Sequence, residues 1–265
     1  MPATGTHSDG VPAVAYQVRR AGGEVLAERD GDAPFYAAST VKLAVLAAAA
    51  RALDTGELTL DEEVASADTF TSQVPGAPDY RIEPDDLDPG MPPPGTFMPV
   101  GLVIERMIVV SSNEATNMVI DLVGLDACNR VLADVGAGAS VVGRKYSDLA
   151  AEERGDSHRT TPADLAALMS AVVTGQVAGP ERTLWMIDLL ARQTDRQLTA
   201  AVPDGVPYGS KSGWVDGIRH DVAFVGTPGP EALVVAVCTR GYDESHAEEA
   251  LRALGSLAVT LAGIR

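Results

Sequence analysis

Strand-like patterns lie at the two ends of this 265-residue chain, and helical patterns fill its middle. Apolar and β-branched residues alternate with polar ones, or run together, in five separate segments. These predicted strands cover residues 11–19, 24–29, 208–215, 220–226 and 232–240. Strands from opposite ends of a chain are buried only if they pair with one another. We therefore expect a single antiparallel sheet that contains both ends.

Helical patterns occupy the segment between these strands and the end of the chain. They predict helices over residues 40–54, 100–110, 113–120, 162–173, 180–191 and 244–262. The run Thr161-Pro162 is a strong helix start, with threonine as N-cap and proline in the first turn. The expected fold class is α+β. Residues 1–38 and 197–265 would form an α/β lobe and residues 39–196 an inserted all-α lobe, within one domain. A site is expected in the cleft between the lobes.

The composition excludes several classes of function. A net charge of −17 argues against nucleic acid, because phosphate binding needs a basic surface. The four histidines lack metal-ligand spacing, and no glycine-rich loop precedes a helix, so neither a metal nor a nucleotide cofactor is expected. Cys128 and Cys238 are expected to be free thiols.

The start of the chain bears on its location. Residues 1–10 are polar and no long apolar span follows, so we expect no membrane-spanning helix. As written, the chain is expected to be cytoplasmic, or secreted if a leader was removed. We expect a monomer with no membrane or nucleic-acid partner.

A proline-rich acidic segment interrupts the middle of the chain. Eight prolines and several acidic residues lie between positions 74 and 100, which predicts a long loop of polyproline character. Two interpretations stay open: a surface insertion, or a rim of the substrate cleft.

The chain has only three lysines, and two of them stand in short serine-containing motifs. The first motif is Ser39-x-x-Lys42 at the start of a predicted helix, where both side chains share one face. A serine hydroxyl attacks only when a base takes its proton, and a desolvated lysine with a lowered pKa can be that base. The alternative is a capping serine beside a solvent-facing lysine.

Two more motifs follow along the chain. In Ser111-x-Asn113, the serine can relay a proton and the asparagine can hold a substrate amide, although simple helix capping explains the same residues. In Lys211-Ser212-Gly213, the lysine and hydroxyl can bind a carboxylate. The glycine suggests a close approach of another backbone or a ligand. Polar decoration of an edge strand is the alternative.

The three motifs, in this order, resemble the active site of the serine β-lactamases and penicillin-binding proteins, most of all the class A β-lactamases. The resemblance runs from about residue 14 to residue 261. It implies that Ser39 is the nucleophile, Lys42 the acylation base, Ser111 the proton relay and Asn113 a substrate contact. Lys211, Ser212 and Gly213 would bind the substrate carboxylate. The backbone N–H groups of Ser39 and Trp214 would form the oxyanion hole. Arg219 or His220 would assist carboxylate binding, or form a strand-end ion pair.

The chain departs from the family pattern in two places. Ser112 stands where the family has aspartate. The family glutamate that activates the hydrolytic water has no counterpart in residues 144–150. Asp148 can take over that role, with Glu152 and Glu153 as weaker candidates, or it can pair with Arg144 or Arg154.

The sequence thus predicts a cofactor-free serine hydrolase that acts on a β-lactam or a related small amide or ester, with atypical deacylation. A D-alanyl peptidase, esterase or amidase on the same fold is the first alternative. A non-catalytic ligand-binding protein is the second.

Overall fold

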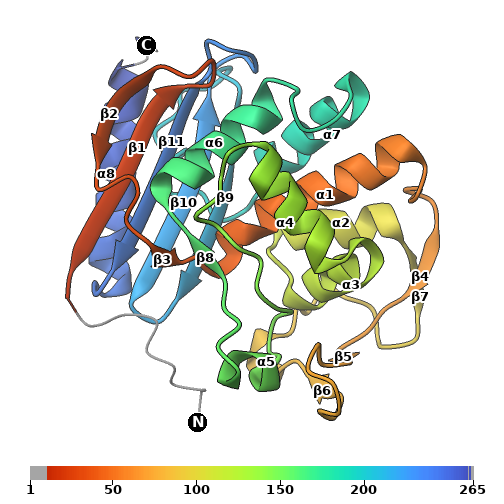
Figure 1. Ribbon diagram of the computed structural model, residues 1–265. Helices are drawn as coiled ribbons and strands as arrows, with labels where there is room; N and C mark the ends of the chain where they lie inside the picture. Colours follow the sequence, from red (N-terminus) through yellow and green to blue (C-terminus); the bar gives the residue numbers. More distant parts are fainter. Residues whose placement is uncertain (1–10, 262, 264–265) are drawn as a thin grey trace.

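The computed structural model describes residues 11–261 and 263, and its centre is one five-stranded antiparallel sheet. The strand order is β2-β1-β11-β10-β9. The bounds are β1 Ala13–Arg20, β2 Val25–Arg29, β9 Tyr208–Val215, β10 Ile218–Val225 and β11 Leu233–Arg240. β1 pairs with β11, so the two ends of the chain are joined in one sheet as predicted (Figure 1).

Helices cover both faces of this sheet (Figure 1). Helix α8 (Glu244–Leu261) lies on one face over a small apolar cluster that includes Val235 and Leu251. The other helices lie on the opposite face around a larger core. They are α1 Lys42–Thr55, α2 Val100–Val109, α3 Asn113–Val123, α4 Leu125–Asp134, α5 Leu149–Glu153, α6 Pro162–Val173 and α7 Pro180–Ala191. The α+β fold class is confirmed.

Helix α1 runs through the middle of the helical layer. Eleven of its fourteen residues are buried, because its run of small alanines lets α2, α3, α4, α6 and α7 contact it from several sides. The helix ends at Gly56, whose φ of 76° places it in the left-handed region that glycine adopts at low cost. This buried helix gives its first turn a fixed position next to the sheet.

The predicted helix starts agree closely with the structure. The Thr161 side chain accepts a hydrogen bond from the Asp164 N–H and caps α6, as the sequence indicated. Helices α4 and α5 were not predicted, because each is short and buries only a few residues. Both cysteines are buried and free, as expected.

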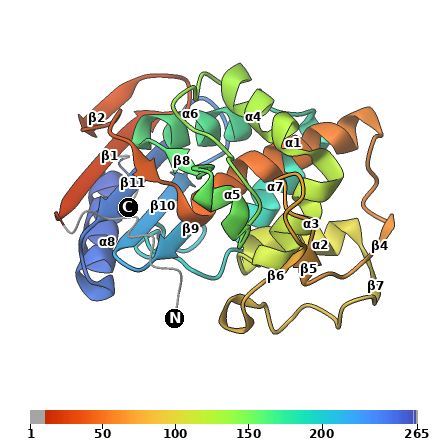
Figure 2. The ribbon, with the colours of Figure 1, turned by 60° about the horizontal axis from the view of Figure 1, so that its bottom comes forward.

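The proline-rich segment carries short elements rather than a uniform loop. It contains β6 (Tyr80–Arg81), the 3-10 turn η2 (Pro84–Asp86) and β7 (Phe97–Pro99). Strand β6 pairs with β5 (Thr69–Phe70), and β7 pairs with β4 (Glu63–Ala65). A further pair joins β3 (Phe35–Tyr36) to β8 (Arg159–Thr160) (Figure 1), and β8 lies close to the start of α1 (Figure 2).

Within residues 11–261, no helix combines the length and apolar character needed to cross a bilayer.

Candidate active site

The predicted nucleophile lies at the point where the helical layer meets strand β9. Ser39 is part of the 3-10 turn η1 (Ala38–Val41), which leads directly into α1. Four non-glycine residues of the described chain have a positive φ: Asp30, Ala38 (47°), Ser111 (61°) and Ser147 (64°). Ala38 directly precedes the nucleophile, and Ser111 is the predicted proton relay. Strained backbone of this kind collects at functional sites, where the surrounding structure holds it in place.

Lys42 is fully buried at the start of α1. Its ammonium Nζ donates to the Ser111 carbonyl oxygen (2.6 Å) and to Asn113 Oδ1 (2.8 Å), and lies 3.2 Å from Ser111 Oγ. Burial, followed by the nearby Lys211 cation, holds the pKa of Lys42 well below its usual value. A lysine with a lowered pKa can be neutral at moderate pH and can take a proton from a hydroxyl.

Lys211 is the second fully buried lysine, and it faces the first across Ser111. Its Nζ donates to the Ser212 carbonyl oxygen (2.7 Å) and to Ser111 Oγ (3.1 Å). Burial lowers the pKa of Lys211 to about 8, so the group carries its charge below that pH and loses it above. The Ser111 hydroxyl therefore lies between two amines, which is a geometry suited to proton relay.

The two neighbouring serines of the middle motif have different contacts. Ser112 is the N-cap of α3: its Oγ accepts from the Ala115 N–H (3.1 Å) and contacts Glu114 Oε2 (3.1 Å). Ser111, with its left-handed backbone, instead directs its hydroxyl to the lysines. Helix capping thus explains Ser112. Ser111 instead belongs with Lys42 and Lys211, and we call these three residues the lysine cluster.

Gly213 allows β9 to pass directly beside the nucleophile. A Cβ at this position would lie 2.6 Å from the Ser39 backbone nitrogen and 2.7 Å from that of Thr40. Only glycine permits this approach. The predicted oxyanion donors are the Ser39 and Trp214 N–H groups. They therefore lie on two segments that pack against each other. The Trp214 side chain is 60% exposed, next to the site.

Ser212 has a partner inside the protein. Its hydroxyl is buried and hydrogen-bonded to the side-chain amide of Gln193 (2.7 Å), which also bonds Ser210. Gln193 thus supports β9 at the edge of the sheet, and no motif predicts this contact.

Arg219 and His220 lie on β10, and both have structural partners elsewhere in the fold. Arg219 forms ion pairs with Asp195 (3.0 Å) and with Glu248 of α8 (2.7 Å), which favours the ion-pair interpretation. His220 Nε2 lies 2.9 Å from the Tyr36 carbonyl oxygen, and its Nδ1 accepts from the Thr239 N–H. Burial lowers the pKa of His220 to about 4. It is therefore neutral at physiological pH and offers a carboxylate no positive charge.

Asp148 is buried and caps α5. Its Oδ1 accepts from Ser72 Oγ (2.8 Å) and from the Ala151 N–H, and its Oδ2 accepts from the Gln73 N–H. The alternative pairing with Arg144 or Arg154 is not what the structure shows. Arg144 pairs with Glu152 and Arg154 with Asp156. These contacts occupy the carboxylate, so a role as deacylation base stays a prediction that the geometry does not favour.

Tyr146 belongs to the site although no motif marked it. Its hydroxyl donates to the Ala38 carbonyl oxygen (3.0 Å), and its ring centre lies 4.5 Å from Lys42 Nζ. Burial raises the pKa of Tyr146, and the nearby Ser39 side chain partly opposes this effect. The only sequence signal is its place in the segment 144–150, where the resemblance implies a glutamate.

The proline-rich segment is anchored beside the lysine cluster. The Asp88 N–H donates to Glu114 Oε1 (2.7 Å), and the Asp88 carboxylate is bound by Arg106 (2.6 Å from Nε). Asp86 and Asp88 also raise the pKa of Lys42, which opposes the larger effect of burial. These contacts favour the rim interpretation of this segment over a plain surface insertion.

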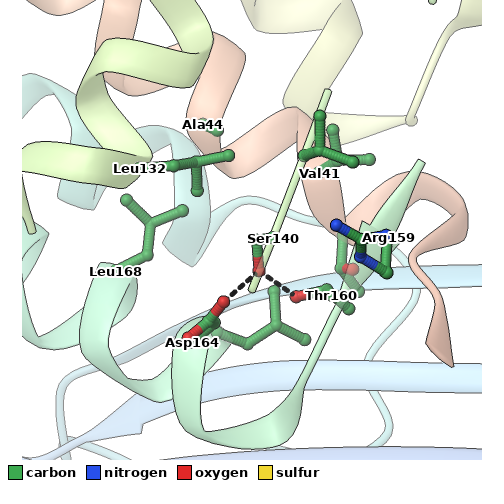
Figure 3. Close-up of a pocket in the computed structure, with 11 residues that line it drawn as sticks. Val41, Ala44, Leu132, Ser140, Arg159, Thr160, Asp164 and Leu168 are labelled. Carbon is green, nitrogen blue, oxygen red and sulfur yellow. Dashed lines mark hydrogen bonds between the residues drawn. The ribbon is translucent and has the colours of Figure 1, made fainter. Parts of the chain in front are cut away.

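Two hollows lie apart from the lysine cluster. A small cavity of about 10 Å³ lies between α1, α4 and α6, where Ser140 bonds Thr160 (2.9 Å) and Asp164 (2.8 Å) (Figure 3). Its volume is close to that of a single water probe, so it cannot hold a substrate. A groove of about 540 Å³ runs between Phe35-Tyr36 and residues 155–159. Neither is lined by Ser39, Lys42 or Lys211.

Comparison with known proteins identifies the family of this chain. The model of the beta-lactamase enzyme family matches residues 6–261. A β-lactamase from Sphaerobacter thermophilus DSM 20745 shares 30% identity and has a TM-score of 0.78, covering 96% of this chain and 93% of its own. PBP-A shares 25% identity at a TM-score of 0.76, with 94% of this chain and 89% of PBP-A covered. A variant of PBP-A has been solved as an acyl-enzyme complex with penicillin G.

An ancestral class A β-lactamase (GNCA) shares 25% identity at a TM-score of 0.74, covering 95% of this chain and 94% of its own. Among the curated proteins, none matches. The family model covers nearly the whole chain, so the chain belongs to the beta-lactamase enzyme family.

Proposed function

We propose that this protein is a serine hydrolase that forms an acyl-enzyme at Ser39 with β-lactams and releases it slowly. The observation that carries the proposal is the arrangement of the two buried lysines around Ser111 beside the nucleophile's turn. The solved acyl-enzyme of PBP-A with penicillin G, on a related fold, supports the same chemistry.

Acylation begins with proton removal from Ser39. Neutral Lys42 takes the hydroxyl proton, and Oγ attacks the lactam carbonyl carbon. The developing oxyanion accepts hydrogen bonds from the Ser39 and Trp214 N–H groups, a pair of fixed dipoles that needs little reorganisation. The lactam C–N bond then breaks, and Ser111 passes a proton from the lysine pair to the departing nitrogen.

The other residues hold the substrate in position. Charged Lys211 attracts the carboxylate that β-lactams carry beside the ring, and Asn113 offers its amide to the substrate side chain. Because the pKa of Lys211 is about 8, this attraction is present at neutral pH and weakens as the pH rises above that value.

Deacylation lacks an evident base. Asp148 is fully engaged by Ser72, Gln73 and Ala151. Glu114 is held by the Asp88 N–H and by Ser112. A carboxylate that already accepts these hydrogen bonds is less able to bind and deprotonate a water, so we expect the acyl-enzyme to accumulate.

Other acyl donors remain candidates for the physiological substrate. A D-alanyl peptide, an ester or an amide would use the same nucleophile, base and oxyanion donors. A purely binding function is disfavoured, because a binder does not need a fully buried lysine with a lowered pKa beside a serine.

A chromogenic cephalosporin tests the proposal by its time course. We expect a burst of close to one product per protein molecule, followed by a slow linear phase, because acylation outpaces release. Ser39→Ala should show no burst, whereas Ser256→Ala, which removes an exposed serine of α8, should behave as the wild type. Rapid linear turnover without a burst would contradict slow release, and no product at all would contradict acylation by β-lactams.

A further inference from the structure

Tyr146 occupies the space on the loop side of the nucleophile. Its side chain is buried, with only 9% of the residue exposed. The hydroxyl donates to the carbonyl oxygen of Ala38, the residue directly before Ser39. The ring centre lies 4.5 Å from Lys42 Nζ, which leaves no room for a water between the ring and the amine. One side chain thus contacts Lys42 and the backbone next to Ser39.

The backbone of Tyr146 is fixed from both sides. Its N–H donates to Asn117 Oδ1 (2.7 Å), and its carbonyl oxygen accepts from Asn117 Nδ2 (2.9 Å). Asn117 is itself fully buried on α3. The next residue, Ser147, has a φ of 64°, and the His158 ring lies 5.0 Å from the Tyr146 ring. Moving this backbone would require breaking both hydrogen bonds to the Asn117 side chain.

The chemistry of the phenol limits what it can do. Burial raises the pKa of Tyr146 far above its usual value, so the group stays a neutral hydrogen-bond donor. It cannot act as the base that activates a water. Its ring can instead stabilise the ammonium that Lys42 becomes when it accepts the Ser39 proton.

Release of the acyl group requires a water beside the ester. The water oxygen attacks the carbonyl carbon, the bond from that carbon to Ser39 Oγ breaks, and a proton returns to Oγ. We propose that Tyr146 is a positioning residue that shields the Ser39 ester from this water and thereby sets the lifetime of the acyl-enzyme. This inference rests on the proposed acylation of Ser39, and it identifies the side chain that makes the adduct long-lived.

The test compares acyl-enzyme lifetimes by intact mass after excess penicillin is removed. Tyr146→Ala should shorten the lifetime by about tenfold or more, since excluding water is what protects a reactive intermediate. It should also acylate more slowly, because the ring no longer supports the Lys42 ammonium. Tyr146→Phe keeps the ring and should retain a lifetime close to that of the wild type.

Tyr208→Ala is the matched control. This tyrosine also has a cation over its ring, but the cation is Arg196, at 4.1 Å, and not Lys42. It should leave the lifetime unchanged. A simple loss of stability would slow acylation without hastening release, so the opposite changes in the two rates distinguish positioning from a structural role. A folded Tyr146→Ala protein with the wild-type lifetime would overturn the inference.

Hydroxylamine gives a second measurement, which uses the acyl adduct of the wild-type protein. A shielded ester should resist this small nucleophile in the native adduct and react with it once the adduct is unfolded. Rapid release of the native adduct by hydroxylamine would overturn the shielding, even if Tyr146→Ala fails to fold. Failure of the wild type to form any adduct would instead contradict the proposed function itself.

Discussion

Replacing Lys42 by methionine is expected to reduce the rate of acylation by about a thousandfold, within the range that a positioned base contributes. Lys42 is fully buried, its pKa is lowered by burial and by Lys211, and its Nζ is bonded around Ser111 and Asn113. Methionine has a similar length but no proton acceptor of useful basicity. Without the amine, the Ser39 hydroxyl keeps its proton and attacks poorly.

The fold should survive this substitution, because an uncharged side chain of similar volume replaces the buried amine and leaves no unpaired charge. The acylation rate is measured by intact mass against time, and thermal unfolding confirms that the variant is folded. Lys145→Met is the matched control: its partner Asp121 is half exposed, so no buried charge is left behind. A Lys42→Met protein that acylates at the wild-type rate would show that another group is the base.

Gly213→Ala is expected to reduce acylation by about a hundredfold or more, the scale of loss that a misplacement of about 1 Å can cause. The new Cβ would lie 2.6 Å from the Ser39 nitrogen and 2.7 Å from the Thr40 nitrogen. Both are backbone atoms of η1, so β9 and the nucleophile's turn must separate. The oxyanion donors would move apart with them. The free energy of unfolding should fall by about 1–3 kcal/mol from overpacking.

A second glycine separates this effect from the general cost of adding a methyl group. Gly138 has no atom within 4 Å of its would-be Cβ and no left-handed φ, so Gly138→Ala should preserve both acylation and stability. The two variants are compared by adduct formation and by urea unfolding. Equal acylation by Gly213→Ala and the wild type would contradict the close approach of β9 to Ser39.

The sequence predicted the frame of the fold because its signals are local. The alternation in β9 and the Thr161 cap of α6 are properties of neighbouring residues, and both agree with the structure. Helix α4 escaped prediction because only Cys128, Val131 and Leu132 are buried among its ten residues. So short an apolar stripe is a weak periodic signal.

The candidate site was predicted where a motif carries the chemistry and missed where a contact is distant in sequence. Ser111 meets Lys42 and Lys211 as the motif order implied. Tyr146 reaches Ala38 across 108 positions, and no pattern in residues 144–150 indicates that contact. Asp148 was a candidate base from its position alone. Its partners Ser72 and Gln73 lie more than seventy positions away, and they make it a helix cap.

The most direct measurement is the intact mass of the protein after it is mixed with a penicillin. Our account predicts a mass increase equal to one drug molecule on the wild type and on Ser256→Ala, and no increase on Ser39→Ala. The adduct should map to the peptide that contains Ser39. An unmodified wild type, or an adduct that persists in Ser39→Ala, would contradict acylation at this serine.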